Sequence, residues 1–323
     1  MQALLEAIAA APMPTDARRI FHGRGGVHPG CEHWSLDWFA PVWLLTSYKP
    51  TNEIELEHIH VALSQRWTEI APPGLQLNWV FQCRSVGQST TRLMAGSVPE
   101  PHDVSEATAV YRLHVLRGQN HGLFLDMANA RQWVRDWIVA HPASHGHSPD
   151  LKVLNLFAYT CAFSVAALQS GAKQVVNVDM SAGALSIGQL NHRLNGLATG
   201  ASFLPHDIFK SWGKIARNGP YHLVIVDPPS FQKGSFVATK DYAKLIRRLP
   251  ALLNPEGVAM MCLNAPELDT HFLKALVAAQ APDLQFIQRL ENPSEFMDTD
   301  PQRALKVLLY RSLKQSHLAV GMG

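Results

Sequence analysis

A proline pair directly after an apolar run is the sharpest chemical signal in this sequence. The run Leu223–Val226 suits a central strand, and it stops at Asp227-Pro228-Pro229-Ser230-Phe231. Two prolines fix φ and remove two N–H donors, so the chain is stiffened and its carbonyl oxygens remain available as acceptors. Together with the Asp227 carboxylate, they suit an amino group or ring N–H of a base, on which Phe231 could stack. We predict a target site made of Asp227, Pro228, Pro229 and Phe231. The alternative is a stiff loop that merely ends a strand.

The segment from Asn155 to Ser164 joins a strand pattern to a helix pattern. Backbone N–H groups at the start of a helix can face a bound ligand. The segment contains no glycine, which argues against the glycine-rich loop that lets a backbone approach a pyrophosphate. S-adenosylmethionine has no pyrophosphate, so this less open turn suits it better. An ordinary buried strand followed by a helix is the alternative.

Two acids follow the next two strand patterns. Asp179 ends the run that begins at Gln174, at a place where a carboxylate can accept both hydroxyls of an adenosine ribose. Asp207 follows the third run; it could bind the adenine edge while Ile208 or Phe209 covers the ring. The plain alternatives are a helix N-cap for Asp179 and a surface turn for Asp207.

These residues need a parallel sheet to position them. After Pro149, short apolar runs alternate with helix patterns at Ser164–Gln169, Ala182–Asn195, Tyr242–Leu253 and Glu267–Gln280, which is typical of βαβ units. The predicted strands are Lys152–Phe157, Gln174–Asp179, Ala201–Leu204, His222–Val226, Val258–Leu263, Leu284–Gln288 and Lys306–Tyr310. Seven strands with such helices predict an α/β fold with a doubly wound sheet, in which ligands bind beyond the carboxyl ends of the strands.

The first half of the chain has a different pattern. Glycines and prolines interrupt residues 1–40, which predicts an irregular N-terminal arm. Residues 41–126 predict a small α+β domain, a candidate for substrate recognition, and residues 127–323 the catalytic domain. The small domain is expected to hold a helix at Glu53–Trp67 and strands at Val42–Tyr48, Leu75–Arg84, Thr91–Val98, Ala109–Leu116 and Leu123–Asp126.

Several of these strings, taken in order, resemble one family. They are Gly122-Leu123-Phe124-Leu125-Asp126, Asn155-Leu156-Phe157-Ala158-Tyr159-Thr160, Val178-Asp179-Met180-Ser181, Asn195-Gly196-Leu197 and Asp227-Pro228-Pro229-Ser230-Phe231. The sequence resembles bacterial large-subunit ribosomal RNA methyltransferases, which include guanine-N7 and cytosine-C5 enzymes with Rossmann-like class I catalytic domains. The resemblance covers roughly residues 41 to 315.

The resemblance implies S-adenosylmethionine as cofactor and ribosomal RNA as substrate. It places around the cofactor Asp126, Phe157, Tyr159, Thr160, Asp179, Met180 and Asp207, and we add Ser164 and Ile208 from their neighbouring positions. Cys161 stands where the family usually has glycine, and Ala128 replaces one arginine although Arg131 keeps a second. In the cytosine-C5 members a cysteine nucleophile follows the fifth strand, and the matching residue here is Asn264, with Cys262 inside the strand. Since cytosine C5 needs covalent attack by a thiolate, we expect transfer to a base nitrogen.

Composition narrows the remaining possibilities. With 47% hydrophobic and 17% charged residues the chain is globular, and a net charge of +2 leaves RNA contact to local basic patches. The four cysteines are far apart, so we expect neither disulfides nor zinc; His28, Cys31 and His33 lack a fourth metal ligand. The first residues lack the basic start of a signal peptide. No apolar run reaches a membrane span, and we expect a cytoplasmic protein.

The roles of two groups of basic residues stay open, and so do two alternative functions. Arg18, Arg19 and Arg24 could follow a phosphate backbone or belong to a packing tail that Trp34, Trp38 and Trp43 anchor. Lys240, Lys244, Arg247 and Arg248 share a predicted helix, whose basic face is either solvated or near the substrate. The chain could instead methylate a small molecule or a protein, or be an inactive methyltransferase-like protein that binds RNA. A nicotinamide dehydrogenase is disfavoured by the missing glycine loop.

Overall fold

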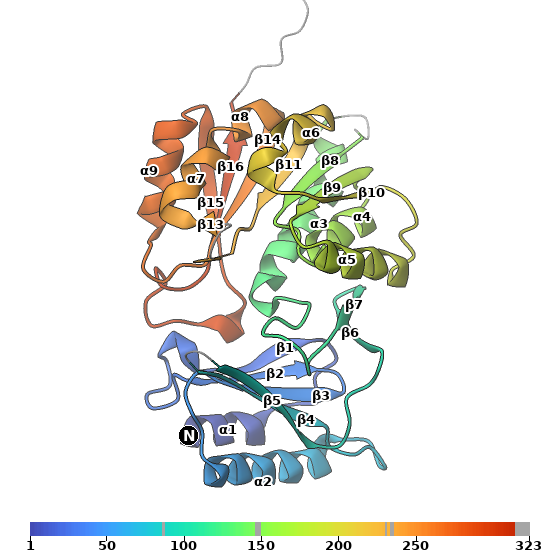
Figure 1. Cartoon of the computed structure of the whole chain (residues 1–323), viewed down its shortest axis with the longest axis vertical. Coiled ribbons are helices and arrows are strands. Elements are labelled where there is room, and N and C mark those ends of the chain that lie inside the picture. Colours follow the sequence, from blue (N-terminus) through green and yellow to red (C-terminus); the bar gives the residue numbers. More distant parts are fainter. Residues whose placement is uncertain (86–87, 146–149, 230, 233–235, 314–323) are drawn as a thin grey trace, which may run out of the picture. The chain divides into compact units, whose positions relative to one another are not determined.

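The computed structural model divides the chain into two compact units (Figure 1). It describes every residue except 86–87, 146–149, 230, 233–235 and 314–323. One unit consists of Met1–Ala128 together with Asn292–Pro301, and the other of Asn129–Glu291 together with Gln302–Gly323. The short segment Asn292–Pro301 therefore belongs with residues that lie far away in the sequence.

The second unit is built on a seven-stranded sheet in the order β10-β9-β8-β11-β14-β16-β15. Its strands are β8 (Lys152–Leu156), β9 (Gln174–Asp179), β10 (Ala201–Pro205), β11 (Tyr221–Val226), β14 (Leu253–Leu263), β15 (Leu284–Leu290) and β16 (Lys306–Ser312). Strands β10, β9, β8, β11 and β14 are parallel to one another, and β16 is antiparallel to both β14 and β15. The chain order reverses between β8 and β11, so the predicted Rossmann-like doubly wound sheet is confirmed.

Helices accompany this sheet. They are α3 (Ala128–His145), α4 (Ala162–Gln169), α5 (Ala182–Leu194), α6 (Trp212–Arg217), α7 (Ala238–Ile246), α8 (Leu249–Leu252) and α9 (Thr270–Gln280). Side chains of α6, α7, α8 and α9 share one apolar core with alternate residues of β8, β9 and β11, and α4 and α5 contact β8, β9 and β10. The predicted helix Tyr242–Leu253 is in fact two, α7 and α8, and begins earlier than predicted.

The first unit contains a five-stranded sheet in the order β1-β2-β3-β4-β5. Its elements are α1 (Gln2–Ala10), β1 (Arg18–His22), β2 (Trp34–Phe39), β3 (Val42–Ser47), α2 (Glu53–Ile70), β4 (Trp79–Ser85), β5 (Gln88–Ala95), a hairpin of β6 (His102–Glu106) and β7 (Ala109–Leu113), and the 3-10 turns η1 (Gly23–Gly25), η2 (Leu125–Met127) and η4 (Ser294–Phe296). Apolar residues of α1 and α2 share a core with one face of the sheet, which presents Trp34, Trp38, Trp43 and Trp79.

Residues 1–40 are the main correction to the predicted fold. They contribute α1, β1 and β2 to the first unit and do not form an irregular arm. Gly23 and Gly25 mark close approaches of backbone: a Cβ at Gly23 would lie 1.8 Å from the Cys31 carbonyl oxygen. The segment Leu123–Asp126, predicted as a strand, is irregular at its first two residues and then enters η2. The sequence of residues 1–40 looks irregular because its elements are short and separated by tight turns.

Candidate functional site

The predicted cofactor and target residues of the second unit meet at one edge of its sheet. Leu156, the last residue of β8, pairs with Val178 of β9 and with Val226 of β11. Val178 also pairs with Leu204 of β10. Because these strands are parallel neighbours, Asp179 at the end of β9 lies beside the segments that follow the other strands. These segments contain Phe157, Asp207 and Asp227. This edge includes the reversal in strand order, where doubly wound sheets bind ligands.

The turn after β8 has an unusual backbone. Phe157, Tyr159 and Cys161 have φ values of 58°, 48° and 63°, in the left-handed region that costs a residue with a side chain roughly 1–3 kcal/mol. The turn is held by hydrogen bonds from Ala158 N–H to Val178 O (3.1 Å) and from Cys161 N–H to Ala158 O (2.8 Å). Such strain persists where the surroundings over-determine it, and it clusters at ligand sites.

Cys161 is accommodated by a glycine on the next helix. The cysteine is fully buried, and a Cβ added at Gly188 of α5 would lie only 2.5 Å from its Sγ and 3.1 Å from its Cβ. The thiol therefore fills the space that Gly188 leaves open. Cys161, where the resemblance led us to expect glycine, is thus accommodated by packing within a hydrogen-bonded turn.

We expect Gly188→Ala to destabilise the second unit, because the new methyl group overpacks the contact with Cys161 by an amount typically worth about 1–3 kcal/mol. Adding Cys161→Gly should recover most of the loss, since it removes the clashing sulfur and suits the positive φ. Urea unfolding of both single variants and the double variant measures the coupling. Strictly additive effects would show that the two residues are independent.

Asp179 holds the same turn and keeps acceptor capacity. Its Oδ2 accepts from Tyr159 N–H (2.8 Å) and its Oδ1 from Ser181 N–H (2.8 Å). Ser181 caps helix α5 by accepting from Ala184 N–H (3.1 Å), so Asp179 is not the N-cap. A carboxylate has about four lone-pair positions, and hydroxyls of a ribose could fill the remaining ones. The neighbouring Met180 side chain is 56% exposed at this edge.

The other predicted cofactor residues differ in position. Asp207 caps the 3-10 turn η3 (Ile208–Lys210), with Oδ1 accepting from Phe209 N–H (2.9 Å), as the plain alternative expected. Ile208 is buried in the core and has little surface for a ring. Asp126 lies in η2, which belongs to the first unit. The adenine role of Asp207 and the cofactor role of Asp126 stay predictions.

Ser164 and Thr160 lie on the inner side of the turn, where both are buried. Ser164 Oγ accepts from Asn177 Nδ2 (3.0 Å) and contacts His192 Nε2 at 2.9 Å, while His192 Nδ1 lies 2.7 Å from Gly188 O. The carbonyl requires an N–H at Nδ1, so Nε2 accepts from the serine hydroxyl and the imidazole is neutral. Burial lowers the pKa of His192 accordingly. Ser164 thus links Asn177 and His192 inside the second unit, and its contact with the cofactor stays a prediction.

Asp227 and the proline pair directly follow β11. Asp227 is half-buried and Pro228 is buried. The Tyr242 hydroxyl of α7 donates to the carbonyl of Cys262, and burial raises its pKa, with the charges of Cys262 and Asp227 as further causes. Cys262 is buried inside β14 and Asn264 is exposed just after it. Phe231 begins the short strand β12 (Phe231–Gln232). Ser230 and the side chain of Phe231 lie outside the described residues, so stacking on a base stays a prediction.

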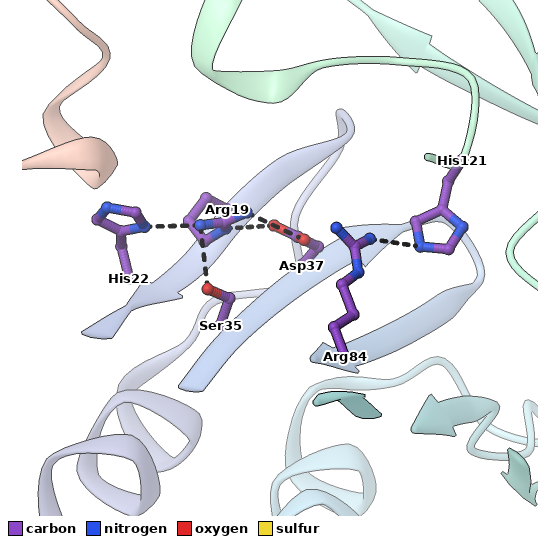
Figure 2. A network of polar contacts seen from close by, with 6 residues as sticks. All are labelled: Arg19, His22, Ser35, Asp37, Arg84 and His121. Carbon is purple, nitrogen blue, oxygen red and sulfur yellow. Dashed lines mark hydrogen bonds and ion pairs between the residues drawn. The ribbon is translucent and has the colours of Figure 1, made fainter. Parts of the chain in front are cut away.

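A second polar cluster lies on the first unit's sheet, on the face opposite α1 and α2 (Figure 2). Arg19 of β1 donates through Nε and Nη2 to both carboxylate oxygens of Asp37, and through Nη1 to His22 Nδ1 (2.6 Å) and Ser35 Oγ (3.3 Å). Arg84 of β4 donates to His121 Nε2 at 3.3 Å. Each histidine nitrogen accepts from a guanidinium, so both imidazoles must be neutral.

The surroundings of these histidines favour the neutral form. Burial, followed by the charges of Arg19 and Arg24, lowers the pKa of His22 to about 3. Burial, followed by the charge of Arg84, lowers the pKa of His121 to about 4. Protonation would also remove the acceptor that each arginine uses. The cluster thus keeps its positive charge on the arginines across neutral pH.

This arrangement predicts loss of stability in mild acid. An unfolded histidine titrates near pH 6.5, whereas native His121 titrates at about 4, so the unfolded chain binds more protons between these values. The stabilisation is complete above about pH 6.5 and decreases as the pH falls, by roughly 2 kcal/mol at pH 5. Urea unfolding from pH 7 to 5 should give a shallower pH dependence for His121→Gln than for the unchanged protein. Parallel curves would contradict this role of His121.

Among the described residues, no three His, Cys, Asp or Glu side chains gather in a way that could hold a metal ion. No helix in the same part of the chain is long and apolar enough to cross a bilayer.

Sequence comparison connects most of the chain with one group of proteins. A family model described as S-adenosylmethionine-dependent methyltransferase matches residues 18–311. Ribosomal RNA large subunit methyltransferase I of Aeromonas hydrophila is 32% identical over 216 residues, which cover 64% of this chain and 52% of that protein. The methyltransferase K/L of Psychrobacter cryohalolentis is 37% identical over 151 residues, 44% of this chain and 18% of that protein. The chain thus spans about half the length of the first relative, and less of the second.

Structure comparison agrees at the level of the fold. A Streptococcus mutans protein described as a candidate SAM-dependent methyltransferase superposes with a TM-score of 0.75 at 24% identity, covering 96% of this chain and 78% of that one. A candidate methyltransferase complexed with SAH gives the same values. The SAM-dependent methyltransferase of Agrobacterium tumefaciens has a TM-score of 0.64 at 17% identity, with 94% and 92% coverage.

Proposed function

Because this chain belongs to the S-adenosylmethionine-dependent methyltransferase family, we propose that it methylates a nitrogen of a base in ribosomal RNA, in the cytoplasm. The observation that carries the proposal is the meeting of two segments at adjacent strand ends. The strained turn Phe157–Cys161 follows β8, and Asp227-Pro228-Pro229 follows the neighbouring strand β11. A cofactor held by the first segment would have its reactive end beside the second.

The side chains and backbone at this edge of the sheet fit S-adenosylmethionine. The Asp179 carboxylate already accepts two backbone N–H groups and has lone pairs left for the two ribose hydroxyls. The turn carries no glycine that would open it for a pyrophosphate. When bound, S-adenosylmethionine supplies a methyl group on a positively charged sulfur. The side chains of Phe157 and Met180, both partly accessible at this edge, would cover the remainder of the ligand.

The residues at the end of β11 would orient the target base. The Asp227 carboxylate and the carbonyl oxygens of the proline pair would accept from its amino or ring N–H groups and aim the lone pair of the nitrogen at the methyl carbon. Transfer then forms a nitrogen–carbon bond as the carbon–sulfur bond breaks, and an exocyclic amine would also release a proton. Positioning of this kind supplies much of the rate enhancement when two reactants are aligned.

Nitrogen is favoured over carbon as the methylated atom. Methylation at cytosine C5 requires a thiolate to attack the ring first. At the place after β14 where such a thiol is expected, the chain has the exposed Asn264, and Cys262 is buried within the strand. The side chains of this chain therefore suit direct transfer to a nitrogen.

RNA as the substrate class is supported by the relatives and by local charge. The relatives in Aeromonas and Psychrobacter are named as ribosomal RNA methyltransferases. Four basic side chains of α7 and the residues just after it are exposed, namely Lys240, Lys244, Arg247 and Arg248. A hollow of about 580 Å³ beyond β10 is lined by His206, Lys210, Ser211, Gly213, Lys214 and Arg217. These patches suit phosphates, and we assign substrate recognition also to the small domain at residues 41–126.

The test is methyl transfer from tritiated S-adenosylmethionine to large-subunit ribosomal RNA transcribed without modifications. Digestion to nucleosides and mass spectrometry then identify the methylated atom. We expect label in one nucleoside, on a nitrogen. Label in free nucleosides or lysate proteins, with none in the RNA, would support the small-molecule or protein alternative. Cofactor binding without transfer to any of these would favour an inactive RNA-binding protein.

A further inference from the structure

We propose that Arg24, Arg84 and Tyr48, on the polar face of the first unit's sheet, form a binding site for a phosphate group of the RNA backbone. The inference rests on the proposed RNA substrate and adds a specific contact that lies entirely within the first unit. The arginines would supply the N–H donors, and the tyrosine ring would hold their guanidinium groups in place.

The polar face has more cations than contacting carboxylates. Three arginines lie close together, since burial and, after it, the charges of Arg19 and Arg24 lower the pKa values of both His22 and Arg84. Of the three, Arg19 is paired with Asp37. Within the part of the chain that the structure describes, neither Arg24 nor Arg84 has a carboxylate in ion-pair range. Among the described residues, these two guanidinium groups therefore have no ion-pair partner.

The two unpaired guanidinium groups are oriented by one aromatic ring. The Arg24 Cζ lies 4.2 Å from the Tyr48 ring centroid, and the Arg84 Cζ lies 5.9 Å from it. Such cation–π contacts fix a guanidinium plane but leave its edge N–H groups available. A planar fork with available donors matches two oxygens of a phosphate.

Neutral partners hold Arg84 without cancelling its charge. Its Nε donates to Gln82 Oε1 and its Nη2 to Gln119 O and His121 Nε2. No acceptor for its Nη1 is found among the described residues, and Figure 2 shows this nitrogen on the side away from His121. Arg24 is exposed at the surface. The site thus combines a partly buried guanidinium with an exposed one, both against the same ring.

The salt dependence of RNA binding distinguishes a phosphate contact from general positive charge. The probe is a fragment of unmodified large-subunit RNA. Its Kd is measured at KCl concentrations from about 50 to about 300 mM. We expect Arg24→Gln and Arg84→Gln each to weaken binding roughly tenfold at low salt. Each should also reduce the slope of log Kd against log salt by about 0.7 to 0.9. Arg24→Lys and Arg84→Lys should each keep part of the slope, since lysine keeps the positive charge but lacks the planar guanidinium fork.

Arg92→Gln is the matched control, because Arg92 lies on β5 of the same sheet but is paired with Glu53. The inference fails if Arg24→Gln, which removes an exposed side chain, changes affinity and slope no more than this control. Unfolding curves exclude a folding defect in Arg84→Gln. Methyl transfer by the unchanged protein is measured in parallel. If it methylates RNA but the salt slopes of both variants are unaltered, the phosphate site is refuted and the proposed function stands. No RNA binding and no transfer by the unchanged protein refute the proposed function, and the phosphate site with it.

Discussion

Replacing Asp227 by asparagine is expected to lower the turnover of methyl transfer by roughly 10²- to 10³-fold, the loss typical when one preorganised polar contact to the reacting group is removed. Asp227 directly follows β11 and is half-buried, and its charge contributes to the raised pKa of Tyr242. Asparagine keeps the shape but presents an NH₂ donor where the base offers its own N–H. The affinity for S-adenosylmethionine should change little, because Asp179 and the β8 turn hold that ligand.

Single-turnover kinetics with saturating cofactor and RNA measure this effect directly, and calorimetry measures the cofactor affinity. Asp150→Asn is a suitable control, since Asp150 is an exposed acid of the same unit that pairs with Lys173. If the turnover of Asp227→Asn is within about twofold of that of the control variant, Asp227 does not belong to the target site. A parallel loss of cofactor affinity would place it at the cofactor.

Asp179→Ala is expected to have the opposite signature. It removes the acceptor for the ribose hydroxyls and the anchors of Tyr159 N–H and Ser181 N–H. Hydrogen bonds to a charged group are worth about 1.5–3 kcal/mol, so the Kd for S-adenosylmethionine should rise roughly 10- to 100-fold. At saturating cofactor, turnover should recover much of its normal value, because the lost binding is common to the ground and transition states.

Calorimetry with S-adenosylmethionine, with NAD as a second ligand, tests this expectation. Asp150→Ala again provides the control, since it removes a carboxylate without touching the strand ends. An unchanged Kd in Asp179→Ala would exclude the ribose role and leave Asp179 as a support of the turn. Binding of NAD in place of S-adenosylmethionine would overturn the cofactor assignment itself.

The second unit could be predicted closely because its sequence pattern is local. A buried parallel strand is a short run of apolar residues, and the predicted run Gln174–Asp179 coincides with β9. The order of the motifs along the chain then places them at strand ends. The first 40 residues were predicted wrongly for the converse reason: α1, β1 and β2 are short and are separated by tight turns, so no periodic pattern develops. Their pairing into one sheet is a contact between distant residues.

The sequence alone determined the type of fold, the cofactor class and the segments that follow the strands, because apolar periodicity and proline or acid positions are properties of neighbouring residues. Only the tertiary structure decided how each side chain is used. It showed that Gly188 makes room for Cys161 and that Ser164 faces Asn177 and His192. It also brought Arg24 and Arg84 to the same tyrosine. These pairs are 27, 13 and 60 residues apart in sequence (188 − 161, 177 − 164 and 84 − 24), and such contacts depend on packing that no local pattern encodes.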